Sequence, residues 1–205
     1  NYVKAAYERK KWAFVSDYAR FWILYNYGGV YFDTDVELIK PINEIIENGP
    51  FMGYEAYCDI DFLNPKKEHL INPGLGIASE KKSIFYKEVL DYYDRQDFVN
   101  EDGNINIVTV VERVSHLLAD KGLSLDGKIC NINGITIYPE EYFCPMNYAN
   151  GKIVITDNTI SIHHYEMSWQ STTSKVKMVF KRKLPSKVLS YILRTKGKVK
   201  RKCGI

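Results

Sequence analysis

Aromatic residues near the N-terminus repeat with the period of an α-helix. Four of them recur at intervals of three and four residues, a spacing that places side chains on one face that packs on a core: Tyr18, Phe21, Trp22 and Tyr25. The pattern predicts a helix over residues 2–27 with a break near Ser16. The pair Gly28-Gly29 follows, and glycine commonly ends a helix because it tolerates the left-handed backbone conformation.

Short apolar runs predict strands further along the chain, and amphipathic segments predict additional helices. The predicted strands cover residues 30–32 (short and buried), 36–39, 51–55, 74–79, 129–139 (two strands around Asn133-Gly134), 153–155 and 160–164. The predicted helices cover residues 83–93, 105–119 and 175–194, the last with a break at Pro185, and residues 59–70 are predicted to be a polar loop. Helices and strands alternate first and strands cluster later, so the pattern predicts an α/β fold with a mixed sheet.

The composition is typical of a folded protein with a single domain. A chain of 205 residues with 45% hydrophobic residues is long and apolar enough for one domain with a core, which argues against disorder. No apolar run reaches about 20 residues, so we expect no membrane-spanning segment. The four cysteines are scattered and include no Cys-x-x-Cys pair, which favours free thiols in a reducing compartment and a cytoplasmic location.

The charge is distributed unevenly. Residues 175–205 contain twelve Lys or Arg and no Asp or Glu, so the rest of the chain carries 28 − 12 = 16 basic and 25 acidic residues, a net charge of −9. The segment also has an apolar side and a basic side, which is the make-up of a helix at a membrane interface. We therefore expect residues 175–205 to bind an anionic membrane surface at its cytoplasmic face. The alternatives are a solubilising terminus or a helix whose apolar side packs on residues 1–174.

Two aspartates follow the predicted strand at residues 30–32. Side chains alternate along a strand, so Asp33 and Asp35 would point to the same side while Thr34 points away. Neighbouring carboxylates repel each other, and a hard divalent cation such as Mn²⁺ or Mg²⁺ would remove that repulsion. Such a cation, shared with a diphosphate, would neutralise charge on a departing nucleoside diphosphate.

A second Asp-x-Asp sequence provides an internal comparison. Asp59-Ile60-Asp61 lies in a predicted polar loop with no strand before it, so we expect it to be solvent-exposed without a site. Only the first pair has the context of helix, double glycine and apolar strand.

Other candidate residues lie on the first helix and near the C-terminal end. Asp17 and Arg20 are three residues apart, so they share a helix face, either as a simple ion pair or as ligands for a donor sugar and its phosphates. The predicted strand at 160–164 ends in His163 and His164, either of which could provide a third metal ligand. Trp169 could belong to the core or could close a donor pocket.

These motifs together resemble glycosyltransferase family 32. The resemblance rests on Ser16-Asp17-Tyr18-Ala19-Arg20, on residues 28–35 (Gly-Gly-Val-Tyr-Phe-Asp-Thr-Asp) and on the late His-His and Ser168-Trp169 pairs, and it runs from about Tyr2 to Trp169. It implies a GT-A fold, with a Rossmann-type mixed sheet flanked by helices. It also implies a retaining hexosyltransferase that uses a UDP- or GDP-sugar, as in bacterial capsule and surface-polysaccharide enzymes.

The resemblance also implies residue roles. Asp17 and Arg20 would hold the donor sugar, with Tyr31 close to it. Asp33 would contact the sugar or a metal-bound water, and Asp35 would bind the metal directly. His163 would be a further metal ligand, with His164 as the alternative, and Ser168 with Trp169 would close over the diphosphate.

The start of the chain departs from the family pattern. Family members usually begin with a strand resembling Ile-Pro-Lys-Ile-Ile-His, a helix and a second strand, and no such sequence precedes Asn1. We therefore expect residues 1–174 to form a catalytic domain that lacks its first strands, followed by the basic segment 175–205. The strand at 30–32 would be central in the sheet once those strands were present.

Three classes of function could account for parts of this sequence. A glycosyltransferase acting on a glycan or lipid-linked acceptor explains the motifs best. A metal-dependent phosphoryl-transfer enzyme usually needs more carboxylates around two metals, and none are in obvious spacing. A carbohydrate-binding module would explain the sixteen tyrosines and the basic segment but not the Asp33 and Asp35 pair. Nothing in the sequence predicts a nucleic acid as a partner.

Overall fold

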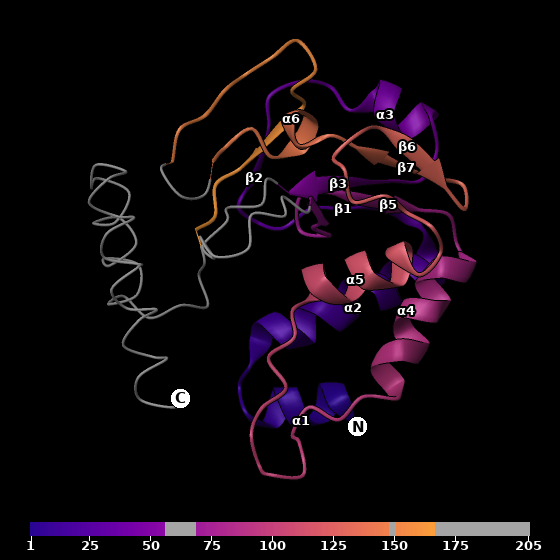
Figure 1. Cartoon of the computed structure of the whole chain (residues 1–205), viewed down its shortest axis with the longest axis vertical. Helices are drawn as coiled ribbons and strands as arrows, with labels where there is room; N and C mark the ends of the chain where they lie inside the picture. The colour runs from indigo at the N-terminus through magenta and orange to yellow at the C-terminus, as the bar shows by residue number, and fades with distance from the viewer. Residues whose placement is uncertain (56–68, 148–150, 167–205) are drawn as a thin grey trace.

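The computed structural model describes residues 1–55, 69–147 and 151–166 of the chain (Figure 1). The predicted helix at 175–194, the pair Ser168-Trp169 and the sequence Asp59-Ile60-Asp61 lie outside the described residues. The helices are α1 (Tyr2–Glu8), α2 (Trp12–Tyr27), α3 (Asn43–Glu47), α4 (Ile84–Asp94), α5 (Val110–Ala119) and α6 (Glu140–Phe143). The strands are β1 (Gly29–Tyr31), β2 (Val36–Leu38), β3 (Phe51–Glu55), β4 (Leu70–Ile71), β5 (Ile77–Ser79), β6 (Cys130–Ile132), β7 (Ile135–Tyr138) and β8 (Ser161–His163).

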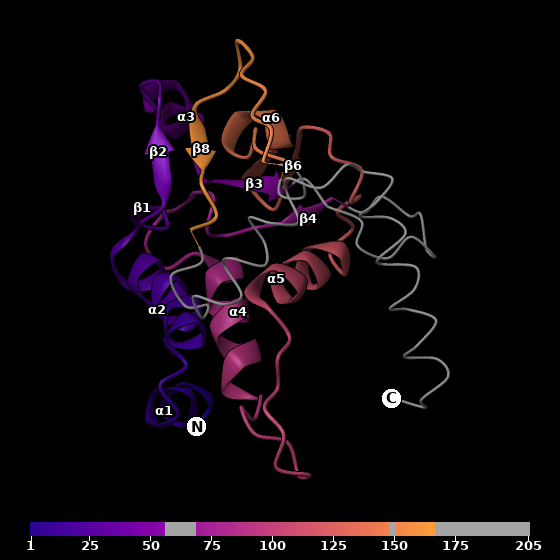
Figure 2. The same cartoon turned by 90° about the vertical axis from the view of Figure 1, so that its left-hand side faces the viewer.

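The strands lie in a middle layer between two groups of helices. Helices α1, α2, α4 and α5 cover one side, and the short helices α3 and α6 lie on the other (Figures 1 and 2). Four strands pair in the order β4-β3-β7-β6, in which β3 and β7 are parallel and the other pairs antiparallel. Two further antiparallel pairs join β1 to β5 and β2 to β8. The predicted α/β class with mixed strand pairing is therefore confirmed, and the arrangement is consistent with a GT-A-like fold.

Two hydrophobic cores hold these layers together. The larger core combines residues of α1, α2, α4 and α5 with the inward side chains of the strands, and includes Phe21, Tyr54 and Tyr86, each fully buried. The smaller core lies on the side of α3 and α6, where the rings of Phe51 and Phe143 stack with centroids 5.3 Å apart. The sheet is thus packed on both faces, which fixes the loops at the ends of its strands.

The N-terminal helical region breaks earlier than predicted. Helix α1 ends at Glu8, and Lys10 adopts a left-handed conformation with φ of 56° before α2 begins. Three consecutive basic residues, Arg9-Lys10-Lys11, are exposed there. Ser16 lies inside α2 and does not break it, and its hydroxyl donates a hydrogen bond to the Ala13 carbonyl at 2.8 Å.

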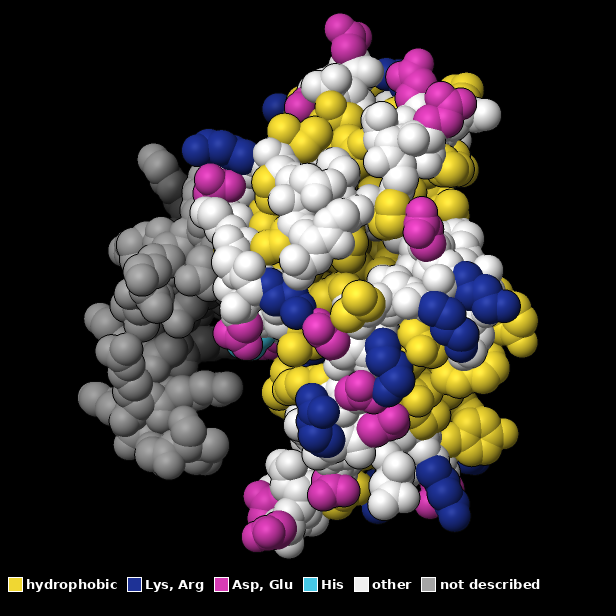
Figure 3. Space-filling view, turned by 90° about the vertical axis from the view of Figure 1, so that its right-hand side faces the viewer, with side chains coloured by type: hydrophobic (Ala, Val, Ile, Leu, Met, Phe, Trp, Pro, Cys, Tyr) yellow, Lys and Arg dark blue, Asp and Glu magenta, His cyan; other side chains and the backbone are white. Residues whose placement is uncertain are grey.

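The aromatic stripe on α2 is only partly buried. Phe21 is fully buried, as predicted, whereas Trp22 is 45% exposed and was wrongly assigned to the core. Ile23 and Tyr27 on the same helix are exposed as well. Apolar side chains also reach the surface among charged ones on the face shown in Figure 3. A helical period identifies a face but not its width, so it could not exclude Trp22 from the core.

Strand β1 also differs from its prediction. Val30 is exposed, and within the described part of the chain β1 pairs with β5 alone, so it is neither buried nor central here. An apolar run of three residues is too short to distinguish a buried strand from an exposed one.

The remaining predictions hold in part. The Asn133-Gly134 turn does join β6 to β7, and both residues have positive φ angles. The helix predicted at 105–119 begins only at Val110, because the preceding Thr109 caps it. The strand predicted at 74–79 is reduced to β5.

Residues 153–155 form only an isolated bridge, from Ile153 to Met146. The short elements α3, α6 and β4 were not predicted. None of the helices in the described ranges is long and apolar enough to cross a membrane.

Candidate functional site

The helix pair of the predicted site faces the protein interior. Asp17 and Arg20 are 9% and 4% exposed, and Arg20 Nη2 lies 2.9 Å from Asp17 Oδ1. The two residues do form an ion pair, and it lies inside the protein and not on a solvent-exposed helix surface. Removing two charges from water can cost more than their mutual attraction returns, so a buried pair is better evidence for a functional role than for a stabilising one.

Arg20 also connects the helix to the loop after β1. Its Nη2 lies 3.3 Å from Asp33 Oδ1, and its guanidinium lies over the Tyr31 ring at 4.9 Å from the centroid. The Tyr31 hydroxyl donates a hydrogen bond of 2.6 Å to the same Asp33 oxygen. Burial raises the pKa of Tyr31, so its hydroxyl remains a donor at neutral pH. Arg20 and Tyr31 together fix one oxygen of Asp33.

Asp33 is packed closely against the turn before β5. Its backbone N–H donates to the Gly74 carbonyl at 3.0 Å. A Cβ atom on Gly74 would lie 2.2 Å from Asp33 Oδ2, closer than any real contact allows. Position 74 must therefore be glycine for the Asp33 carboxylate to keep this place.

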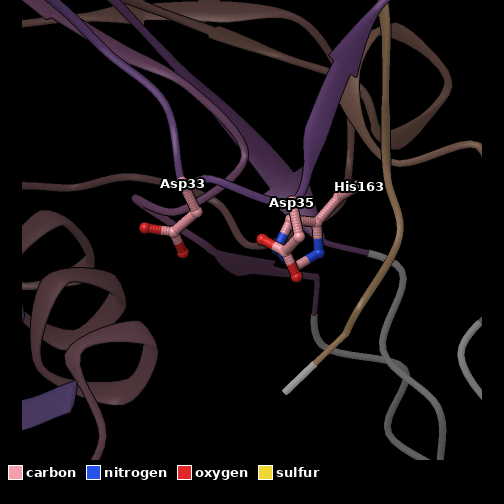
Figure 4. Close-up of side chains that lie close together, drawn as sticks. All are labelled: Asp33, Asp35 and His163. Atoms are coloured by element: carbon pink, nitrogen blue, oxygen red, sulfur yellow. The ribbon is translucent and has the colours of Figure 1, made fainter. Parts of the chain in front are cut away.

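Asp33 and Asp35 are brought together by a turn, not by strand alternation. Strand β1 ends at Tyr31 and β2 begins at Val36, whose N–H donates to the Asp33 carbonyl at 3.1 Å. The strand-based reason for expecting both carboxylates on one side was wrong. Both nevertheless belong to one cluster (Figure 4).

Strand β8 supplies the third member of the cluster. It pairs with β2 so that His163 lies opposite Val36, next to Asp35. His163 Nε2 lies 3.2 Å from Asp35 Oδ1, and the backbone N–H of Glu166 donates to Asp35 Oδ2 at 2.9 Å. The Asp35 side chain is thus held from both sides by the segment that ends β8.

The cluster has the composition of a divalent metal site. One potential ligand atom from each of Asp33, Asp35 and His163 lies within 4.8 Å of the others. Burial lowers the pKa of His163, which favours the neutral imidazole that binds metals. Its Nδ1 is buried and has no hydrogen-bond partner among the described residues, so this part of the chain leaves one ring nitrogen unused. Carboxylate oxygens and an imidazole nitrogen suit Mn²⁺ or Mg²⁺.

His164 points elsewhere. Its Nε2 lies 2.8 Å from Glu37 Oε2 in an exposed pair, and it is not part of the metal cluster. Of the two histidines, the geometry therefore favours His163 as the ligand, while the roles predicted for Ser168 and Trp169 fall outside the described residues.

A comparison with known families covers the first part of this site. Residues 2–52 match the glycosyltransferase sugar-binding region containing the DXD motif. The matched segment includes Asp17, Arg20, Asp33 and Asp35. No curated protein and no solved structure matches the chain.

His163 lies outside the segment that matches the sugar-binding region. Strand pairing places it beside Asp35 although it is distant in sequence. The match supports a glycosyltransferase domain, and the geometry adds a third potential metal ligand to its DXD acids.

Within the matched segment, the buried carboxyl group of Asp17 has a strongly shifted pKa. Burial raises the pKa of Asp17 from 3.8 to about 6, against the opposing effect of Arg20, and the neighbouring charge of Asp33 adds to the increase. The protein therefore holds this carboxylate ionised at neutral pH only at a cost in stability. Ionisable groups with strongly shifted pKa values are found preferentially at functional sites.

Sequence reasoning missed three residues that hydrogen bonds and packing connect to the Asp33 loop and to the end of β8. Glu55 ends β3, Asn72 begins the turn that carries Gly74, and Tyr165 follows the two histidines. Glu55 accepts hydrogen bonds from the side chains of Asn72 and Tyr165. Only the Asn72-Pro73-Gly74 turn had a sequence signal, and that signal indicated a turn, not a site.

Proposed function

We propose that this protein is a metal-dependent glycosyltransferase that moves a sugar from a nucleoside-diphosphate-sugar, a UDP- or GDP-sugar, to a glycan or lipid-linked acceptor. One observation carries the proposal: Asp33, Asp35 and His163 meet in one cluster whose two acids lie in the matched sugar-binding region. A binding module would have no need for a buried acid such as Asp17 held ionised beside that cluster.

The metal would be held by Asp35 and His163, with Asp33 as the third member of the cluster. When bound, a divalent cation neutralises the charge that develops on the leaving nucleoside diphosphate. Asp35 is ready for this role because the Glu166 N–H fixes one of its oxygens. The neutral form of His163, favoured by burial, keeps a nitrogen lone pair available.

Arg20 would act mainly through the two carboxylates that it joins. Its side chain is 5% exposed and it contacts both Asp17 and Asp33. Arg20 thereby stabilises two neighbouring negative charges that would otherwise repel each other. Asp17 and Asp33 would then accept hydrogen bonds from hydroxyl groups of the donor sugar. This arrangement differs from the expectation that Arg20 itself contacts the donor sugar or its phosphates.

The finer parts of the proposal rest on the order of the motifs and on the composition of the chain. Retention of the anomeric configuration rests on the resemblance of the motif order to retaining transferases. An acceptor in surface-polysaccharide synthesis, met at the cytoplasmic face of a membrane, rests on the basic composition of residues 175–205.

A metal-dependent phosphoryl-transfer enzyme is less well supported. Two-metal sites need several carboxylates around two ions. The described residues contain one cluster of this kind, with two carboxylates and one histidine.

Turnover of donors tests the proposal. Wild-type protein would be incubated with a panel of UDP- and GDP-sugars and Mn²⁺, and the released nucleoside diphosphate measured with and without a chelator. We expect release from at least one donor, its loss on chelation and in Asp35→Ala, and its survival in Asp61→Ala. No release from any donor, or equal loss in the two variants, would refute the proposal.

A further inference from the structure

We infer that Glu55 is a positioning residue that couples the two halves of the cluster, the Asp33 loop and the β8 end, through Asn72 and Tyr165. The inference rests on the proposed function, because it concerns the geometry that the metal cluster needs. Glu55 is the last residue of β3, and its carboxylate accepts hydrogen bonds from both Asn72 and Tyr165.

The first connection leads from Glu55 to Asp33. The Asn72 side-chain amide donates to Glu55 Oε2, and the Asn72 Oδ1 atom accepts a hydrogen bond of 2.7 Å from the Gly74 N–H. The Gly74 carbonyl in turn accepts the Asp33 N–H at 3.0 Å. The Asp33 carboxylate occupies the space beside Gly74 that a Cβ atom would need, so this turn and the Asp33 side chain are packed together. The orientation of the Asn72 amide therefore determines where Asp33 lies.

The second connection leads from Glu55 to His163 and Asp35. Tyr165 donates to Glu55, and its ring packs edge-on against His163 with centroids 4.2 Å apart. Tyr165 has a φ of 52°, a left-handed conformation that is unfavourable for a bulky residue and persists only where the surroundings enforce it. This turn brings the Glu166 N–H to Asp35.

A carboxylate suits this junction better than any neutral side chain. Both partners are hydrogen-bond donors, and a carboxylate offers an acceptor oxygen to each. A glutamine has one acceptor oxygen, and its amide would face one of the two donors with a donor of its own. Burial raises the pKa of Glu55, whereas the hydrogen bonds from Asn72 and Tyr165 act in the opposite direction and favour the ionised form that accepts from both.

The test compares local opening of the metal-free protein by hydrogen exchange and mass spectrometry. Glu55→Gln should increase exchange in both segments, residues 31–36 and 161–166. Asn72→Ala should affect mainly the first segment, and Tyr165→Phe mainly the second. Glu141→Gln is the matched control, since Glu141 also accepts hydrogen bonds from two side chains, Thr156 and Asn158, but does not contact the cluster. It should change neither segment.

Mn²⁺ affinity and kinetics provide the second measurement. Glu55→Gln should weaken Mn²⁺ binding about tenfold, the scale seen when groups that orient metal ligands are lost, and lower kcat more than it raises KM. Exchange that rises in one segment only, or evenly over the whole sheet, would overturn the inference, as would unchanged Mn²⁺ affinity in Glu55→Gln. If the wild type neither binds Mn²⁺ nor turns over donor, the proposed function fails, whereas the exchange measurement still decides the coupling.

Discussion

Replacing Asp17 by asparagine should make the protein more stable and inactive. The substitution keeps the size of the side chain and removes the charge of a residue that is only 9% exposed. Because burial raises the pKa of Asp17 from 3.8 to about 6, the folded protein binds this proton more tightly than the unfolded chain does. The contribution of Asp17 to stability is therefore fully present below pH 3.8 and is lost as the pH rises through about 6.

The size of the effect follows from the same pKa values. At about 1.4 kcal/mol per pKa unit, the loss between acid and neutral pH is on the order of 3 kcal/mol. Asparagine resembles the protonated acid and escapes this loss. Asp17→Asn should thus have a higher free energy of unfolding than the wild type near pH 8, with the difference vanishing near pH 4. Activity should be lost, because Asp17 would no longer accept hydrogen bonds as a carboxylate.

Urea unfolding at several pH values, alongside donor turnover, measures both effects. Comparing the two proteins at each pH cancels the titration of every group that they share. In the wild type, turnover should fall on the acid side of the pH profile with a midpoint near 6. A less stable Asp17→Asn variant at pH 8 would show that the pair with Arg20 outweighs burial. Unchanged turnover would remove Asp17 from the site.

Three further predictions concern the ligand, the Asp33 loop and the basic segment. His163→Ala should abolish Mn²⁺ binding measured by calorimetry. His164→Ala removes only an exposed ion pair, so it should leave the Mn²⁺ affinity within about twofold of the wild type. Equal effects of the two substitutions would reject His163 as the ligand. Gly74→Ala should abolish turnover because its Cβ would displace the Asp33 carboxylate, and an active variant would contradict the close packing. Gly53→Ala is the comparison: its Cβ would press against the Phe143 side chain, which should lower the melting temperature without lowering kcat. Vesicle sedimentation should show binding to anionic lipid that weakens with salt and is lost on deletion of residues 175–205; binding that ignores lipid charge would contradict the membrane prediction.

The sequence could predict the local parts of the site. The spacing of Asp17 and Arg20 on a helix required only the helical period, and the structure places both on one buried face. The closeness of Asp33 and Asp35 was predicted for the wrong reason, since a turn replaces the expected strand. Two residues this near in sequence remain neighbours in either conformation.

Long-range relations could not be predicted in this way. Placing His163 beside Asp35 depends on the register of β8 against β2, and hydrophobic patterns do not specify which strands pair. Glu55 had no signal at all, because it ends an otherwise apolar strand and acts through residues from two distant turns. The exposure of Val30 and Trp22 depends likewise on how the elements pack.

The central claim is that Asp33, Asp35 and His163 hold a cation that binds the donor diphosphate. Calorimetric titration of UDP and GDP into the protein, with and without saturating Mn²⁺, tests this claim most directly. The account predicts that Mn²⁺ strengthens binding of at least one nucleoside diphosphate to the wild type, and that this strengthening disappears in Asp35→Ala. Binding of both nucleotides that is the same with and without Mn²⁺, or an Mn²⁺ effect that survives in Asp35→Ala, would contradict it.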